Sequence, residues 1–328
     1  MTTQFRNTTS PGPSPDKEQG PFFTVEDARG VIRIDGRDAL DLINRLGTNR
    51  IDHLRPGEVR ETLLTTEKGR IIDAILVHVR ESDVQLLTSA GKQSEVLAWL
   101  EKFTIMEECE YTDDSALYAQ CSVYNIRNTP AGLILPEPCR VQLAVLDGIE
   151  TTILRHDSVT GSGLRLICKR DQLASIRDYL QHQGIPLFGR QAFDLWRVRT
   201  LTPAVGYELS ERTNPLESGA TRSVDFHKGC YIGQEVIARL DSYDKVQRTL
   251  CRLSWDDAPS LVAPGSELLS EGVNAGFVTT HVPLEGDAGY VGIACIRTSM
   301  ATEGRMLQYH EGEANYTVIV GNTVVSSD

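Results

Sequence analysis

The 328-residue sequence has seven cysteines but no CxxC pair. Structural zinc sites and thioredoxin-type redox sites usually use such pairs, and disulfide frameworks usually use an even number of cysteines. The isolated thiols are Cys109, Cys121, Cys139, Cys168, Cys230, Cys251 and Cys295. We therefore expect no metal site, and we expect most of these thiols to be buried as small apolar side chains.

Long apolar runs are also missing. The sequence contains no stretch of about 18 apolar residues that could span a bilayer. Its N-terminus lacks the basic flank and the apolar core of a signal peptide. These two absences predict a cytoplasmic protein with no membrane partner.

Basic residues are fewer than acidic ones. The 33 Lys and Arg residues oppose 45 Asp and Glu residues, which gives a formal net charge of −12. Proteins hold the phosphates of nucleic acids mainly through clustered cations and counterion release. We therefore expect no stable binding to nucleic acid.

Apolar residues are nearly absent from residues 1–21, which are rich in Thr, Ser, Pro and Gly. Such a segment cannot bury enough surface to offset its ordering entropy, so we predict a disordered tail. The remaining chain is long enough for two or three domains. Its pattern divides into an N-terminal α+β portion at 22–115, a second α+β portion at 116–187, a return segment at 188–245 and a C-terminal portion at 246–328.

Strands and helices alternate in the N-terminal portion in a ferredoxin-like order. Apolar patterning predicts strands at 31–35, 70–79 and 83–89 and a helix at 92–103. A further helix is predicted to end at Gly47. One face of that helix gathers the apolar residues Ala39, Leu42 or Ile43, and Leu46.

The second portion contains a predicted strand at 163–169 and an amphipathic helix that stops at Gly184. From Val246 the sequence changes to short strands separated by turns that contain Gly and Pro, which is typical of a small antiparallel barrel. These strands are expected at 248–255, 276–282, 289–296 and 316–321.

The stretch FHKGCYIGQEVIARL, residues 226–240, gathers reactive side chains at the expected start of a helix. If that helix begins at Gly233, then Cys230 lies just before its N-terminus, where free N–H groups and the helix dipole favour negative charge. Lys228 adds a cation, and both effects would lower the pKa of the Cys230 thiol. In the alternative interpretation, Gly229 and Gly233 only permit a tight turn, and Cys230 packs as a small buried residue.

The octapeptide KGCYIGQE resembles the signature of the YgfZ family, folate-binding proteins related to the T-protein of the glycine cleavage system. The resemblance extends from about Phe23 to Gly321 and includes LLTTEKGRIIDAILVHV, NPLESGATRSVDFHKGC and VIARLDSYDKVQRTL. It implies an α+β, three-domain, T-protein-like architecture. Ferredoxin-like α/β portions would surround a central channel, and a C-terminal antiparallel β-barrel would complete the molecule.

The resemblance also implies a function. Mitochondrial members of the family act in iron–sulfur protein maturation. Relatives have been linked to tRNA thiolation, which we interpret as indirect because the thiolating enzyme carries an iron–sulfur cluster. The implied ligand is tetrahydrofolate or a one-carbon derivative, and the implied partners are iron–sulfur assembly proteins or their client enzymes. Residues 22–115 would form the folate-binding portion, and residues 188–245 would complete the channel.

Within the signature, the resemblance implies that Cys230 is the reactive centre. Tyr231, Gln234 and Glu235 would orient it, and Lys228 would assist through its charge.

A pterin is a flat ring that needs an aromatic or apolar wall and a few converging polar groups. Phe193 and Trp196 are one helical turn apart, so they can share a face and supply this wall; the alternative is ordinary core packing. Arg199 stands where the relatives commonly have a glutamate suited to the N–H edge of a pterin. It could attract the anionic glutamate tail of a folate, or it could be a solvated helix charge.

The T-protein relatives usually show two adjacent aspartates where this sequence has Asp73 followed by Ala74. A carboxylate that would poise the folate nitrogens for aminomethyl transfer is therefore missing or reduced to Asp73. This departure favours a folate-dependent accessory factor over an aminomethyltransferase. Two alternatives stay open: a one-carbon transferase that uses Asp73, and a non-catalytic partner-binding scaffold in which Cys230 is inert and buried.

Overall fold

The computed structural model describes residues 20–26, 28–126, 133–242, 245–255, 257, 259, 262–284 and 289–323. The predicted disordered tail falls almost entirely on residues 1–19, which lie outside the described residues. Among the helices of the described ranges, none is both long enough and apolar enough to cross a membrane.

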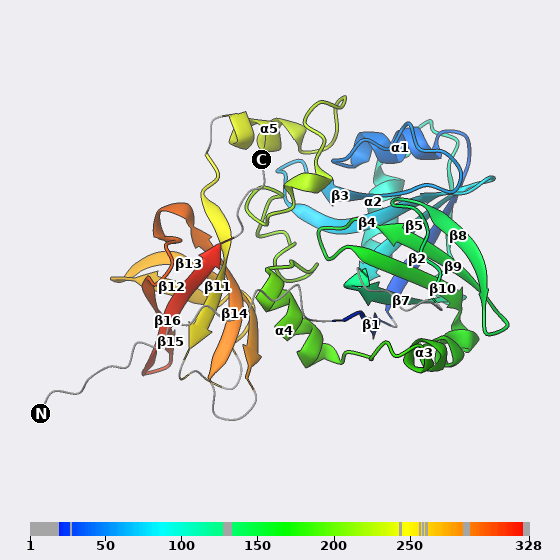
Figure 1. Cartoon of the computed structure of the whole chain (residues 1–328). Helices are drawn as coiled ribbons and strands as arrows, with labels where there is room; N and C mark the ends of the chain where they lie inside the picture. Colours follow the sequence, from blue (N-terminus) through cyan, green and yellow to red (C-terminus); the bar gives the residue numbers. More distant parts are fainter. Residues whose placement is uncertain are drawn as a thin grey trace, which may run out of the picture.

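The first of two five-stranded sheets is antiparallel and follows the predicted N-terminal pattern (Figure 1). In spatial order its strands are β3 (Val59–Thr65), β4 (Ile71–Val79), β5 (Val84–Ala90), β2 (Arg29–Asp35) and β6 (Glu110–Asp113). Helices α1 (Ala39–Leu46) and α2 (Gln93–Phe103) pack on one face of this sheet, against Ile32 and Ile34 among others. The predicted apolar face of α1 is confirmed, because Ala39, Leu42, Ile43 and Leu46 are all buried.

The second sheet is also antiparallel. In spatial order its strands are β1 (Phe22–Val25), β7 (Tyr118–Tyr124), β10 (Gly163–Lys169), β9 (Ile149–His156) and β8 (Val141–Leu146). Helix α3 (Leu173–His182) packs on its outer face through Ile176 and Leu180. The chain thus enters the second sheet with β1 before it builds the first sheet, so the β1–β2 turn connects the two.

The inner faces of the two sheets pack against each other. Val31 and Leu87 of the first sheet share one apolar cluster with Leu154 and Ile167 of the second. The molecule is therefore layered in this region, with α1 and α2 outside one sheet and α3 outside the other (Figure 1).

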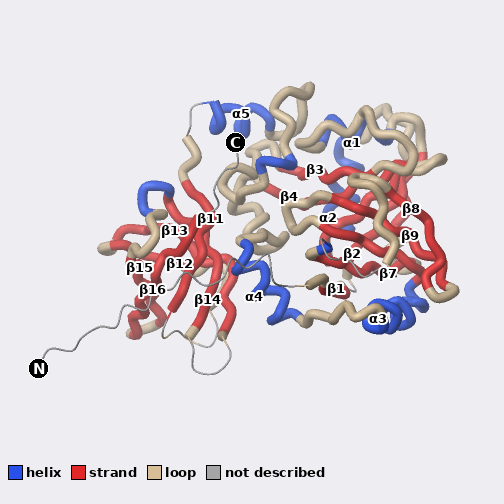
Figure 2. The backbone as a smooth tube through the Cα atoms, in the orientation of Figure 1, coloured by secondary structure: helices blue, strands red, loops and turns tan. Residues whose placement is uncertain are grey.

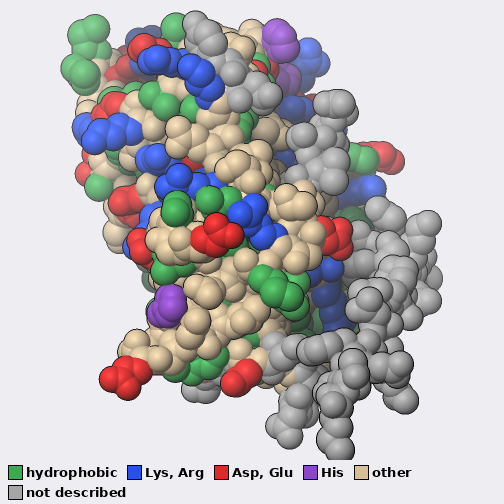
Figure 3. All heavy atoms as spheres, turned by 90° about the vertical axis from the view of Figure 1, so that its left-hand side faces the viewer, with side chains coloured by type: hydrophobic (Ala, Val, Ile, Leu, Met, Phe, Trp, Pro, Cys, Tyr) green, Lys and Arg blue, Asp and Glu red, His purple; other side chains and the backbone are tan. Residues whose placement is uncertain are grey.

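The predicted C-terminal barrel is confirmed as a closed antiparallel barrel of six strands. Around the barrel they are β11 (Arg248–Trp255), β14 (Tyr290–Arg297), β13 (Val273–Pro283), β12 (Glu267–Ser270), β15 (Met306–Glu311) and β16 (Ala314–Thr323). Figure 3 shows that the barrel side of the molecule carries side chains of both charge signs.

Helix α4 (Arg190–Thr200) lies between the barrel and the two sheets (Figures 1 and 2). Val198 of α4 packs against Phe277, Val282 and Ile293 of the barrel. The chain then runs through a long loop that contains the short helix η3 (Thr221–Ser223) and reaches α5 (Gln234–Ser242). The other short 3-10 helices with described bounds are η2 (Arg170–Gln172) and η4 (Thr298–Met300).

Candidate ligand-binding site

A cavity of about 450 Å³ lies where the two sheets meet α4. Its walls come from the β1–β2 turn, the end of β5, Tyr124 of β7, the start of α4 and the turn at 204–207. This volume falls within the range of small-molecule sites. Chain segments from both sheets and from the return segment are therefore needed to form it.

One wall of the cavity is aromatic. Phe188, Phe193 and Tyr124 line it directly. The rings of Phe193 and Trp196 stack with centroids 5.6 Å apart, which confirms that these two residues share a face of α4. Trp196 lies outside the lining and packs behind it, with its ring 5.2 Å from that of Tyr124.

Another wall of the cavity is polar. It is lined by Thr24 of β1, Glu26 in the β1–β2 turn and Arg29 at the start of β2. Glu26 accepts a hydrogen bond of 2.7 Å from Arg29. Burial alone would raise the pKa of the Glu26 carboxyl, but the charge and the hydrogen bond of Arg29 bring it below its ordinary value. Arg29 Nε and Thr24 Oγ1 are buried and have no hydrogen-bond partner among the residues that the structure describes.

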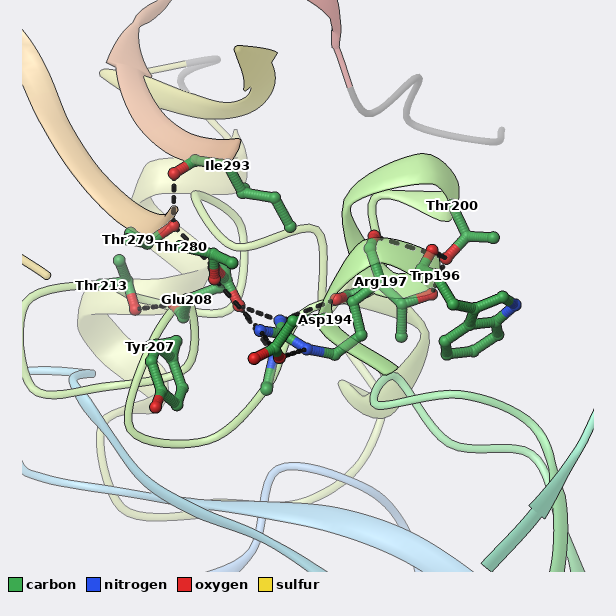
Figure 4. A network of polar contacts seen from close by, with 12 residues as sticks. Asp194, Trp196, Arg197, Thr200, Tyr207, Glu208, Thr213, Thr279, Thr280 and Ile293 are labelled. Carbon is green, nitrogen blue, oxygen red and sulfur yellow. Dashed lines mark hydrogen bonds and ion pairs between the residues drawn. The ribbon is translucent and has the colours of Figure 1, made fainter. Parts of the chain in front are cut away.

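Arg197 joins the cavity to the barrel (Figure 4). Its guanidinium donates to Asp194 at 3.1 and 2.8 Å, to Glu208 at 2.9 Å, to Thr280 Oγ1 at 3.1 Å and to the carbonyl of Thr202 at 3.3 Å. All five N–H groups of the side chain are thereby used. Arg197 therefore holds the wall in place and has no N–H left for a ligand.

Glu208 is fully buried at the centre of the same network (Figure 4). Its carboxylate accepts hydrogen bonds from Thr279 at 2.6 Å and Thr280 at 2.7 Å, both on β13, and from the Ala204 N–H at 2.9 Å. Buried charges are tolerated when they are paired and hydrogen-bonded in this way. The network fastens α4 and the 204–207 turn to the barrel.

Asp73 lies behind the cavity rather than on its surface. The residue is fully buried on β4 and accepts hydrogen bonds from the N–H groups of Ala74 at 2.8 Å and Ser89 at 3.1 Å. Ser89 lines the cavity, whereas Asp73 does not. Burial raises the pKa of the Asp73 carboxyl to about 6.

Arg199 is exposed on α4 and lies outside the cavity lining. Its main-chain carbonyl accepts a hydrogen bond from Arg252 of β11, and the two arginine side chains repel each other electrostatically.

The KGCYIGQE loop is anchored by Lys228 at the C-terminal end of α1. The ammonium group donates to the carbonyls of Asn44, Gly47 and Asn49 at 2.6, 2.7 and 2.8 Å. Burial lowers the pKa of Lys228 to about 8. The ammonium also lies 5.4 Å from the ring centre of the buried Tyr231. Its three donors are all committed to the main chain.

Gly233 anchors the other end of the loop on the β3–β4 turn. Its φ is +84°, and a Cβ there would lie 2.6 Å from the carbonyl oxygen of Thr66. Thr65 donates a hydrogen bond of 2.6 Å to the carbonyl of Ile232. Helix α5 then begins at Gln234, one residue after the predicted start at Gly233, with Glu235 exposed in its first turn.

Cys230 is exposed, which excludes the interpretation that it packs as a buried small residue. It lies outside the cavity lining. The expectation that most thiols are buried is confirmed for Cys121, Cys168, Cys251 and Cys295. In the described parts of the chain, no group of three or more His, Cys, Asp and Glu side chains is arranged to hold a metal ion.

Sequence reasoning missed the charged part of the cavity. Glu26 and Arg29 belong to no recognisable motif, and Glu208 is isolated in a loop. Asp194 and Arg197 could have been found from the sequence. Their i, i+3 spacing places them on the same helix as Phe193 and next to it.

At 26% identity over 290 residues, the chain matches a chloroplastic putative transferase of Arabidopsis thaliana, and the match covers 86% of this chain and 66% of that relative. It is 27% identical over 297 residues to an aminomethyltransferase of Geobacillus kaustophilus, with 85% of this chain and 80% of the relative covered. This chain therefore spans slightly less than two thirds of the plant relative.

The structure superposes on that of the glycine cleavage system aminomethyltransferase T from Bartonella henselae with a TM-score of 0.74. The match has 18% sequence identity and covers 92% of this chain and 85% of the other. The protein therefore has a T-protein-like fold, as the resemblance in sequence predicts. Within it, residues 27–124 match the family model of the GCVT N-terminal domain.

Proposed function

We propose that this protein binds tetrahydrofolate or a one-carbon derivative in the cavity between the sheets, and that it assists the assembly or repair of iron–sulfur enzymes. The observation that carries folate binding is the aromatic wall of Tyr124, Phe188 and Phe193 in a cavity of about 450 Å³. Flat heterocycles bind against such walls when a few polar groups fix their orientation. The T-protein-like fold supports the same ligand.

The iron–sulfur role rests on the resemblance of KGCYIGQE to the YgfZ signature. In this proposal Cys230 is the reactive residue and acts on a protein partner, because its thiol is exposed and lies outside the cavity lining. Lys228 and Tyr231 hold the loop that presents the thiol, and Gln234 and Glu235 begin the helix behind it. An effect on tRNA thiolation would follow indirectly through an iron–sulfur client.

Calorimetric titration with tetrahydrofolate under reducing conditions tests the ligand. We expect saturable binding to the wild type and an affinity about 10-fold lower for Phe193→Ala, since the aromatic contact is lost. Phe103→Ala is a suitable control, because Phe103 packs on Trp99 of α2 and does not line the cavity. Absence of binding to the folded wild type would contradict the proposal.

A folate-dependent one-carbon transferase is the second candidate. It is favoured by the relatives named aminomethyltransferase and by Asp73, whose carboxyl has a pKa of about 6 directly behind Ser89. Turnover with an aminomethyl donor that is lost in Asp73→Asn would establish this candidate. Rescue of iron–sulfur enzyme activity by Asp73→Asn in cells lacking the protein would favour the accessory role.

A further inference from the structure

Strands β1 and β8 form the edges of one sheet, and β3 and β6 form the edges of the other. Three of these four edges are covered or charged. Strand β1 donates a main-chain hydrogen bond to Pro186 and accepts one from Phe188, and β3 accepts one from Thr48. Strand β6 has only four residues, two of which are the exposed acids Glu110 and Asp113. Covered, short and charged edges are the devices by which proteins prevent their sheets from pairing edge to edge.

Strand β8 lacks these devices along most of its length. Its sequence VQLAVL contains no charged residue and no proline, and its register with β9 has no bulge. The Val141 N–H donates to the Gly57 carbonyl at 2.9 Å, but no described residue forms such a bond with Leu143 or Val145 on this edge. Figure 1 shows β8 at the margin of the molecule, on the side away from the barrel.

The main-chain groups of Leu143 and Val145 point away from β9. In an antiparallel ladder, alternate residues bond to the partner strand, and the residues between them direct their N–H and C=O groups to the other side. The bond from Val141 to Gly57 identifies the odd-numbered residues of β8 as the outward set. Ala144, which lies between the two, faces β9. The edge therefore offers two donors and two acceptors at the spacing of a strand.

The side chains of the same two residues are apolar and exposed. Leu143 is 80% exposed and Val145 is 66% exposed. Their i, i+2 spacing places both on one face of the strand. An added strand would thus gain main-chain hydrogen bonds and apolar contacts together, which is how exposed sheet edges recruit partners.

We propose that β8 pairs antiparallel with β8 of a second copy of this chain, about a twofold axis at Ala144. Leu143 of each copy then lies opposite Val145 of the other, because a twofold interface is self-complementary. Each of these two pairs exchanges two main-chain hydrogen bonds. The two five-stranded sheets become one continuous sheet. No residue of β8 lines the ligand cavity, so the inference goes beyond the proposed function and does not depend on it.

Charge complementarity favours a second copy as the partner. Arg140 directly precedes β8 and Asp147 directly follows it, and both are exposed. Antiparallel pairing about Ala144 places Asp147 of one copy opposite Val141 of the other, next to Arg140. Arg140 also forms an ion pair with Glu58 at 3.0 Å, but its side chain remains 52% exposed. Opposite charges therefore meet at both ends of an uncharged centre, which favours this orientation over a parallel one.

Sedimentation at a series of protein concentrations tests the dimer. We expect a monomer–dimer equilibrium with a dissociation constant in the micromolar range, because the interface is short. Val145→Lys should weaken the dimer about 100-fold, since lysine on an edge strand opposes pairing and the change occurs twice in each dimer. Met306→Lys is the matched control and should dimerise like the wild type. Met306 is 68% exposed, but it lies on β15 of the closed barrel, which has no free edge.

A cysteine at the axis tests the register. Ala144 would face its own counterpart in a pair without mutual hydrogen bonds, with Cα atoms about 4.5 Å apart, which is within the range that a disulfide spans. Ala144→Cys should therefore cross-link two copies when oxidised glutathione is the oxidant, as seen by electrophoresis without reductant. Gln142→Cys is the control. It keeps the same native thiols and is more exposed, but its two counterparts would lie roughly 14 Å apart and should not cross-link.

Three outcomes would overturn the proposal. A wild type that stays monomeric at every concentration would leave the β8 edge to a strand of another protein. A dimer that Val145→Lys does not weaken would use a different surface. Cross-linking of Gln142→Cys as readily as Ala144→Cys would exclude the twofold axis at Ala144. None of these outcomes bears on the proposed function, which the titration with tetrahydrofolate tests separately.

Discussion

Asp73 shows what burial does to a single carboxyl group. Its folded-state pKa of about 6 is raised from 3.8, so the folded state binds more protons than the unfolded state between these values. Stability contributed by the neutral carboxyl is therefore lost as the pH rises from about 4 to about 6. The penalty at neutral pH is on the order of 3 kcal/mol.

Asp73→Asn should remove this dependence. We expect the stability of the variant relative to the wild type to increase between pH 4 and pH 6, as measured by urea unfolding. Asp178→Asn, at an exposed position on α3, is the control and should leave the profile unchanged. Parallel profiles for Asp73→Asn and the wild type would show that Asp73 ionises normally.

Cys230 and Cys168 illustrate the difference between an accessible and a buried thiol. Cys230 is exposed, whereas burial on β10 raises the pKa of Cys168 to about 11. A thiol reagent should label Cys230 in the native protein and Cys168 only after unfolding, which peptide mass spectrometry can measure. Cys230→Ser should leave the melting temperature nearly unchanged, whereas Cys168→Ser should lower it. Equal labelling of both thiols would refute this distinction.

At the scale of elements, α5 depends on the turn that precedes it. Gly233→Ala places a Cβ 2.6 Å from the Thr66 carbonyl at a φ of +84°, so we expect a loss of stability of roughly 1–3 kcal/mol. Gly229→Ala is the matched control, because its Cβ would meet nothing within 4 Å. Thermal unfolding of the two variants measures the difference, and equal melting temperatures would contradict the docking of the loop on the β3–β4 turn.

Periodicity was sufficient to predict most individual elements. The apolar spacing in α1, the strand pattern of β4 and the short strands of the barrel all follow from local sequence. The stacking of Phe193 on Trp196 also follows from helical spacing. Contacts distant in sequence could not be predicted in this way: Lys228 reaches Asn44, and Glu208 reaches Thr279. The charged side of the cavity also depends on contacts between residues that are distant in sequence.

At the scale of the whole molecule, the barrel is held to the cavity by a buried ion pair. Arg197→Met leaves Glu208 buried without its cation, and we expect a loss of about 3–5 kcal/mol. Arg197→Met combined with Glu208→Gln should cost less than the single change, because no buried charge remains unpaired. Denaturant unfolding measures both variants.

Arg45→Met, which removes an exposed ion pair, is the control for Arg197→Met. The pair of Arg45 with Glu107 is 2.7 Å long, but the Arg45 side chain is 46% exposed, so its loss should cost at most about 1 kcal/mol. A similar small loss for Arg197→Met would show that the barrel is held mainly by its apolar contacts with Val198.

The pairing of β1 with β7 has a consequence for the folding of the nascent chain on the ribosome. Phe22 pairs with Tyr124, which is synthesised only after every strand of the first sheet. Until then β1 has no partner, so the turn that carries Glu26 is held only on its β2 side, where Arg29 pairs with Ala90 of β5. Such long-range pairing closes late in folding. The cavity should therefore be among the last features to appear, and a chain released before residue 124 would hold the strands of the first sheet without the cavity.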